Sequence, residues 1–275
     1  MAHEPSVKAF AERGILRRVT VDRRLAHLTG PEVGRVLTPQ SILVQPVGAV
    51  EQHGPHLPLV TDLAIADAVS TRAVTQAATA GLDVWLLPAL AYTKSNEHAW
   101  SPGTIWMTAR TMLSVVEDIG RCVATTPCRK LVFMNGHGGN SALLAMANRE
   151  IRLATGLQTF LAHPTLPADQ GGSSSQHELG MGIHGGHDET SMMLHLHPEM
   201  VHMERALRNV PEHLAKNTQV RFGGGIQFGW LSNDFGSDGH IGDPTLADAD
   251  HGRVLVEGAV AHFVAGLHEI SRFAP

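Results

Sequence analysis

The sequence predicts an α/β protein with a mostly parallel central sheet and helices on both faces. Short apolar runs alternate with long helical stretches along residues 41–162, which is typical of βαβ units. Polar, glycine-containing loops follow three of these runs. Hydrophobic residues make up 43% of the 275 residues, so the chain is able to bury a large core. In such a sheet, ligands bind beyond the carboxyl ends of the strands, where these loops gather.

Local signals define each element. Strands are predicted in four short apolar runs, at residues 41–47, 83–88, 130–134 and 157–162. Helices are predicted at 62–80, 108–124, 140–155, 187–197 and 247–272. The first of these helices is rich in alanine without Gly or Pro and stops at Gly81, and Gly156 stops the third.

The chain is expected to form one catalytic domain at 39–275, preceded by an N-terminal arm at 1–38 with one or two short helices. No internal repeat and no long linker divides residues 39–275. The segment 220–245 is rich in glycine and is predicted to be a loop. We expect its part from Gly223 to Gly239 to shape specificity.

Composition excludes several classes of protein. The net charge is −5, from 21 basic and 26 acidic residues, which gives no reason to expect a nucleic-acid partner. No apolar run approaches the length of a membrane span, and no secretion signal is evident at the N-terminus. Two cysteines do not form a disulfide framework, so we expect a cytoplasmic protein. The 18 histidines raise the question of metal ligation.

The first polar cluster follows the first predicted strand. Glu51 and His53 are two residues apart in an extended, Gly/Pro-rich segment, so their side chains point to the same side. Asp62 opens the next helix, where its ordinary role is that of an N-cap, although an aspartate there is also able to bind metal. A solvated polar loop is the alternative interpretation of Glu51 and His53.

The second cluster, residues 135–140, follows the third strand and has His137 at its centre. Glycines before a helix are also able to cradle a phosphate or to form a tight turn. The spacing fits neither the dinucleotide fingerprint nor the P-loop, so a metal-ligating His137 is favoured. Glu97 lies in the loop after the second strand, where it is either a residue that orients substrate or water, or a surface carboxylate.

The third cluster includes His184 and Glu189, just before and within a Met/Leu-rich helix. Five motifs, taken together, resemble the creatininase (creatinine amidohydrolase) family over about residues 40–265. These motifs are Glu51-Gln-His-Gly-Pro-His-Leu-Pro58 with Asp62, Pro102-Gly-Thr104, Asn135-Gly-His-Gly-Gly-Asn140, His184-Gly-Gly-x-x-Glu-Thr-Ser191 and Gly242-Asp-Pro-Thr245.

The resemblance implies a three-layer α/β/α subunit, usually in a homohexamer, with two divalent metal ions (Zn, Mn or Fe) at the strand ends. By this resemblance, Glu51, Asp62 and His137 bind one ion, while His53 and Asp62 bind the other. His184 matches the catalytic histidine of the family.

The chain departs from creatininase itself at three positions. Creatininase has an aromatic residue and a glutamate where this chain has Gly138 and Gly139, and a glutamate where Ile183 stands. The glutamate at position 139 completes the second metal site of creatininase. Glu189 is our candidate for the replacement ligand or base.

The predicted function is metal-dependent hydrolysis of an amide-type C–N bond, cyclic amide or formamide, in a small polar substrate. Two ions that share a water lower its pKa and polarise the attacked carbonyl, and His184 passes a proton to the leaving nitrogen. The alternatives are C–C ring opening of an oxidised cyclitol and a peptidase acting on a peptide-derived cofactor precursor. The alternative to an enzyme is a non-catalytic module that binds phosphate or a nucleotide. Such a module would give no role to Glu51, His53 and Asp62.

Overall fold

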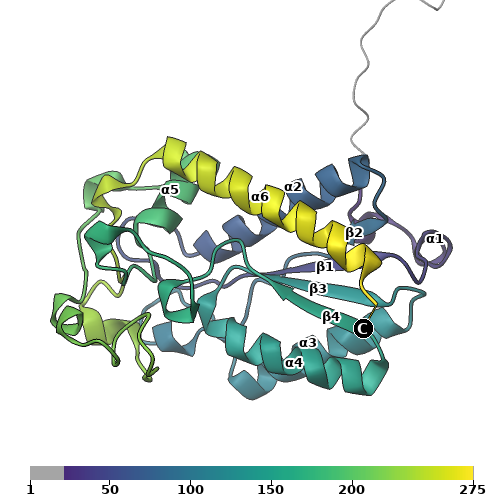
Figure 1. The fold of residues 1–275 in the computed structure, drawn as a ribbon, viewed down its shortest axis with the longest axis horizontal. Helices are drawn as coiled ribbons and strands as arrows, with labels where there is room; N and C mark the ends of the chain where they lie inside the picture. The colour runs from purple at the N-terminus through teal and green to yellow at the C-terminus, as the bar shows by residue number, and fades with distance from the viewer. Residues whose placement is uncertain (1–21, 275) are drawn as a thin grey trace, which may run out of the picture.

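A four-stranded parallel sheet forms the centre of the computed structural model, which describes residues 22–274 (Figure 1). The strands are β1 (Ile42–Val47), β2 (Val84–Leu86), β3 (Lys130–Asn135) and β4 (Gln158–Ala162). The helices are α1 (Gly30–Val36), α2 (Thr61–Thr79), α3 (Ala109–Ala124), α4 (Ser141–Thr155), α5 (His187–Leu196) and α6 (Ala249–Arg272). The strands and helices predicted from the sequence are therefore confirmed, with small shifts at their ends.

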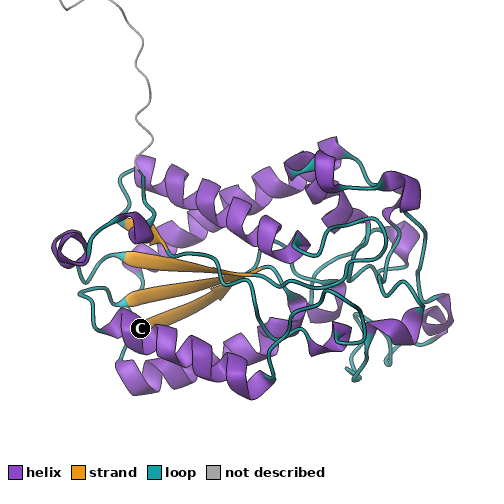
Figure 2. Ribbon diagram, turned by 180° about the vertical axis from the view of Figure 1, so that it is seen from behind, coloured by secondary structure: helices purple, strands orange, loops and turns teal. Residues whose placement is uncertain are grey.

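Helices cover both faces of the sheet, which confirms the three-layer α/β/α fold (Figures 1 and 2). Because successive side chains of a strand point to opposite faces, Ile42 and Val44 of β1 pack on the side of α2, α5 and α6. Leu43, between them, packs on the side of α3 and α4. Both faces of each central strand are thus buried, as in other parallel sheets.

The strand order is β2-β1-β3-β4, so the chain reverses direction across the sheet after β2. Helix α2 connects β1 to β2 on one face, and α3 connects β2 to β3 on the other. The loops that follow β1 and β3 therefore diverge at a topological switch point, where open α/β sheets bind their ligands. Of the predicted site residues, Glu51, His53 and His137 lie in these two loops, and Asp62 lies at the start of α2.

The predicted N-terminal arm is described from residue 22 onward, and residues 1–21 lie outside the described residues. A 3-10 turn (Leu25–His27) and α1 are the short helices expected there. The Leu86 N–H donates to the Arg23 carbonyl over 2.8 Å, and Leu37 is buried in the core. This part of the arm therefore packs against the β2 edge of the sheet.

Among the described residues, α6 has the length and apolar composition that a membrane crossing requires. Its buried residues Val256, Val260, Phe263 and Leu267 recur every three or four positions, as in a helix that packs along one stripe. That stripe belongs to the same core cluster as α2 and the sheet. We therefore interpret α6 as a layer helix of this fold.

Candidate active site

Glu51 and His53 lie immediately beyond β1 and are both 0% exposed, which excludes a solvated polar loop. The Glu51 N–H donates to the Leu59 carbonyl over 2.9 Å and holds the segment close to the start of α2. The Nδ1 atom of His53 lies 3.2 Å from the Glu51 carbonyl oxygen. When Nδ1 donates to this carbonyl, Nε2 is the nitrogen that faces the interior of the site.

Asp62 is the second residue of α2, not its N-cap, because Val60 occupies the cap position. Its carboxylate is buried between two imidazoles, with Oδ1 at 3.0 Å from Nε2 of His53. Glycine at 136 allows this close approach, since a Cβ there would lie 2.5 Å from the Asp62 carbonyl oxygen. The helix therefore presents Asp62 directly to the loop after β3.

His137 lies in that loop and faces the same carboxylate from the other side. Its Nδ1 atom is 3.0 Å from Asp62 Oδ2 and 3.3 Å from Glu51 Oε2. Its Nε2 atom lies 3.0 Å from the Lys94 carbonyl oxygen. In His53 and His137 alike, one nitrogen meets a backbone carbonyl and the other meets carboxylates, which is the usual setting of metal-ligating histidines.

The side chains form two ligand groups that share Asp62. Glu51, Asp62 and His137 make up one, and His53, Asp62 and Glu189 make up the other, each with ligand atoms within 4.8 Å of one another. Among the described residues, Glu51 Oε1 and Asp62 Oδ2 are buried within 3.0–3.3 Å of imidazole nitrogens of His98 and His137, but neither oxygen accepts a well-aligned hydrogen bond. Because an unsatisfied buried carboxylate oxygen is costly, these two atoms fit coordination to a cation.

Charge in this site favours bound cations. Burial lowers the pKa of His53, but the charges of Asp62, Glu189 and Glu51 outweigh burial and raise it to about 10. Burial raises the pKa of Asp62, but the two histidines outweigh burial and hold it below its usual range. The clustered carboxylates therefore create a negative potential that either protons on the imidazoles or metal ions neutralise.

Glu189 reaches the site from the first turn of α5. The Gly185 N–H donates to its Oε2 over 2.7 Å, and this oxygen lies 3.9 Å from Nε2 of His53. Burial, together with the charges of Asp62 and Glu51, raises the pKa of Glu189 to about 7 even though His53 lowers it. The geometry is that of a further carboxylate beside the His53 group.

His184 approaches Glu51 at Oε1, whereas His137 approaches it at Oε2. The Nε2 atom of His184 is 2.7 Å from the Gln52 carbonyl oxygen, and its Nδ1 atom is 3.6 Å from Glu51 Oε1. Burial and the neighbouring rings of His98 and His53 lower the pKa of His184 well below its usual value, so the ring is neutral at pH 7. The ligand atoms of Glu51, His53 and His184 also lie within 4.8 Å of one another, as in a metal-ligand group.

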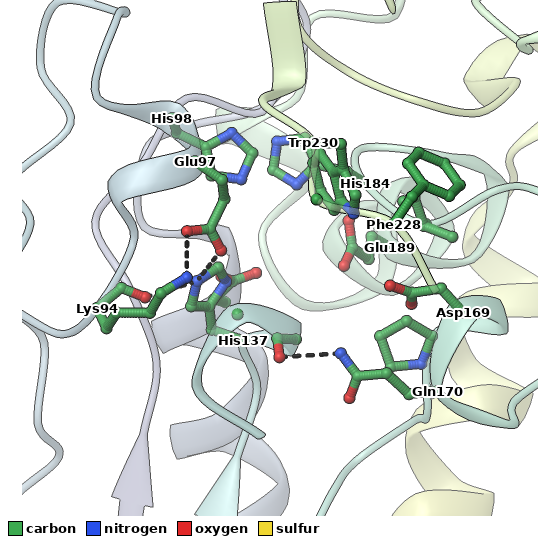
Figure 3. A pocket seen from close by; sticks show the side chains of 16 residues that line it. Lys94, Glu97, His98, His137, Asp169, Gln170, His184, Glu189, Phe228 and Trp230 are labelled. Atoms are coloured by element: carbon green, nitrogen blue, oxygen red, sulfur yellow. Dashed lines mark hydrogen bonds and ion pairs between the residues drawn. The ribbon is translucent and has the colours of Figure 1, made fainter. Parts of the chain in front are cut away.

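Glu97 is only 7% exposed and is not a surface carboxylate. It pairs with Lys94 over 2.7 Å and lies 3.3 Å from Nε2 of His137 (Figure 3). Burial raises the pKa of Glu97, but His137 and Lys94 outweigh burial and lower it below its usual range. The structure therefore brings all seven sequence-predicted residues together: Glu51, His53, Asp62, Glu97, His137, His184 and Glu189.

Two site residues escaped the sequence analysis. His98 is buried and stacks on His184, with ring centroids 4.2 Å apart, and its Nε2 lies 3.3 Å from Glu51 Oε1. Ser95 donates from Oγ to Glu51 Oε2 over 2.5 Å. Both belong to the same loop as Glu97, so the position of that loop after β2 was the available signal.

The site opens into a cavity of about 260 Å³ (Figure 3). Asp62, Glu97, His137, His184 and Glu189 all line it. A larger cavity of about 660 Å³ adjoins it. The two share the lining residues Gly138, Asp169, Gln170, Phe228 and Trp230. The loop expected to shape specificity therefore forms walls of both cavities.

The family model described as creatinine amidohydrolase (creatininase) matches residues 26–267. The chain belongs to the creatininase family. Relatives within this family include the mycofactocin precursor peptide peptidase of Mycobacterium ulcerans, 36% identical over 94% of this chain and 95% of the relative. The creatinine amidohydrolase of Pseudomonas putida is 34% identical over 64% of this chain and 72% of its own length.

Solved creatininases share the fold of this family member. A manganese form aligns with a TM-score of 0.70 and 26% identity over 92% of this chain and 100% of the other. A creatininase variant described as the Zn–Zn type is also similar. Solved members of the family thus include Zn and Mn forms, and this chain has groups of imidazole and carboxylate side chains that could hold such ions.

Proposed function

We propose that this creatininase-family hydrolase cleaves a peptide bond in a peptide-derived substrate. In this proposal, one divalent ion is held by Glu51, Asp62 and His137, and a second by His53, Asp62 and Glu189. The observation that carries it is the pair of ligand groups that share Asp62, a buried residue that lines the cavity. Imidazole and carboxylate donors without thiolates suit Zn²⁺, Mn²⁺ or Fe²⁺ at a catalytic rather than a closed structural site.

Two divalent ions in such a site supply Lewis acidity and an activated water at neutral pH. The protein side chains supply orientation and proton transfer. The Lys94 and Glu51 carbonyls orient His137 and His53 through their outer nitrogens. The neutral ring of His184, held at Nε2 by the Gln52 carbonyl, is able to accept a proton at Nδ1 and pass it to the leaving amine.

Two features favour a peptide over a small cyclic amide. The peptidase relative from Mycobacterium ulcerans matches 94% of this chain, whereas the creatinine amidohydrolase relative matches 64%. The adjoining cavity of about 660 Å³ extends the site beyond the space that a small ring requires, and Phe222, Phe228 and Trp230 line it. A peptide is long enough to place its scissile bond at Asp62 and a neighbouring side chain in the second cavity.

Hydrolysis of a cyclic amide is the second candidate, favoured by the family match and by the 34% identical creatinine amidohydrolase. A substrate panel separates the two candidates. The metal-loaded protein is incubated with short peptides, creatinine and other lactams, and N-formyl amides, and the products are identified by mass spectrometry. We expect peptide cleavage that disappears in Asp62→Asn but persists in Asp250→Asn, which removes a carboxylate that is 96% exposed. Turnover of lactams or formamides without any peptide cleavage would overturn the proposal.

A further inference from the structure

A second cluster of metal-binding side chains lies where the N-termini of α5 and α6 meet. His187 and Asp188 are the first two residues of α5, and His251 lies in the first turn of α6. Their ligand atoms lie within 4.8 Å of one another, and all three side chains are partly buried. None of the three belongs to the two groups that share Asp62.

The spacing of these atoms resembles that of the candidate active site. Asp188 Oδ1 lies 3.1 Å from His187 Nδ1 and 3.0 Å from His251 Nε2. The carboxylate oxygens of Asp62 lie at the same 3.0 Å from the imidazoles that flank them. Ligand atoms around a tetrahedral Zn²⁺ with bonds of about 2.0–2.1 Å are separated by roughly 3.3 Å, so small side-chain movements would bring this cluster to coordination distance.

A third imidazole adjoins the cluster. The ring of His177 meets that of His187 edge-on, with centroids 4.9 Å apart, and the His187 and His251 rings are 4.6 Å apart. Three imidazoles and one carboxylate therefore gather at one place. Such a set of nitrogen and oxygen donors is typical of sites for Zn²⁺ and similar divalent transition metals.

Helix capping does not account for the cluster, because other groups satisfy the ends of both helices. Glu178 Oε1 accepts from the His187 N–H over 2.9 Å at the start of α5. The Asp248 side chain is the N-cap of α6 and accepts from the His251 N–H over 2.9 Å. Among the described residues, the hydrogen-bond partners of the Asp188 carboxylate are the imidazoles of His187 and His251.

We propose that His187, Asp188 and His251 bind a divalent transition-metal ion of the Zn²⁺ type at a site separate from the catalytic centre. The ion links the first turns of α5 and α6. Glu189 is the next residue of α5, so the linked turn also fixes the backbone that carries Glu189 towards His53. A cavity of about 40 Å³, lined by both His187 and Asp188 and by His184 and Glu189, lies between the cluster and the candidate active site.

The test is the zinc content of the protein after equilibrium dialysis against Zn²⁺, measured by elemental mass spectrometry. We expect His251→Gln and Asp188→Asn each to contain one equivalent per chain less than the wild type. His262→Gln is the matched control, because His262 is an exposed histidine of the same helix. We expect it to retain the full content. Equal zinc contents in wild type and His251→Gln would overturn the proposal.

A second comparison separates this site from the catalytic ions. In the Asp62→Asn background, which removes the ligand shared by the two catalytic groups, one equivalent should remain, and adding His251→Gln should remove it. Thermal unfolding gives an independent readout. Zn²⁺ should raise the melting temperature of Asp62→Asn but not that of the double variant. Without metal, the two proteins should melt at the same temperature. An equal zinc-induced rise in both proteins would contradict the site even if peptide hydrolysis were established.

Discussion

The carboxylate of Glu97 occupies the space that a side chain at position 139 would need. A Cβ on Gly139 would lie 1.8 Å from Glu97 Oε1 and 2.4 Å from His137 Nε2. By resemblance, creatininase carries a metal-binding glutamate at this position. In this chain, Glu97 from the loop after β2 fills the space beside Gly139 in the loop after β3.

Gly139→Ala should weaken metal binding by the Glu51, Asp62 and His137 group. The new methyl group would displace both Glu97 and the outer nitrogen of His137, and changes to such supporting contacts typically cost about 10–100-fold in metal affinity. Competition with a chelator measures this affinity. Gly138→Ala is the control, because its Cβ would meet only side-chain atoms of Gln170 and Pro167, at 3.0 Å or more. Equal affinities in the two variants would contradict this account of Gly139.

Glu189→Gln tests the second ligand group. The amide keeps the shape of the side chain and its contact with the Gly185 N–H, but it removes the negative charge beside His53. We expect the variant to lose one bound metal ion per chain and its hydrolytic activity. Elemental analysis gives the metal content, with Glu199→Gln, an exposed carboxylate, as the control. Unchanged metal content in Glu189→Gln would show that Glu189 is not a ligand.

His184→Gln separates proton transfer from metal binding. If His184 acts in proton transfer, kcat should fall by about 10²–10⁴-fold while the metal content stays unchanged. His184 also lies close enough to Glu51 and His53 to share a metal ion with them, so the metal content of the variant tests a second role. Loss of a metal ion from this variant would assign His184 as a ligand rather than as a proton carrier.

The order of the elements and the main ligands could be predicted from the sequence because their signals are local. The strand at 42–47 is an apolar run, and Glu51 and His53 follow it at a spacing that aligns their side chains. His98 could not be predicted in this way. Its loop was expected at this edge of the sheet, but the stacking of His98 against His184, which comes from a distant part of the chain, is a result of tertiary packing.

The ordinary interpretation of Asp62 as an N-cap was wrong for a similar reason. Its place on α2 was correctly predicted, but its carboxylate turns toward His53 and His137, whose positions depend on the sheet. The loop from Gly223 to Gly239 was expected to shape specificity. Its aromatic residues Phe228 and Trp230 do line the cavities, but only tertiary packing reveals that arrangement. The homohexamer and the cytoplasmic location stay predictions.

His56 should make the protein less stable in acid. It is fully buried, and burial together with the charges of His240 and His53 lowers its pKa to about 4 from an ordinary value of 6.5. Below pH 6.5 the His56 side chain of the unfolded protein takes up a proton, whereas that of the folded protein does not. The contribution of His56 to the free energy of unfolding is therefore fully present above pH 6.5 and falls towards pH 4. This group alone accounts for a loss of up to about 3 kcal/mol.

Urea unfolding of wild type and His56→Gln at matched metal content, between pH 4 and pH 8, measures this contribution. The variant should show a shallower loss of unfolding free energy between pH 6.5 and pH 4, with little change of slope above pH 7. The same slope in both proteins over the acidic range would contradict the role given to His56.

Asp62 belongs to both of the proposed metal-ligand groups, so the most direct measurement is the metal content of Asp62→Asn relative to wild type. The two proteins are loaded with the same metal, dialysed together and analysed for bound metal per chain, with Asp250→Asn as the control. The account predicts that Asp62→Asn contains two equivalents less than the wild type while Asp250→Asn loses none. An Asp62→Asn protein that is folded and retains the metal content of the wild type would contradict it.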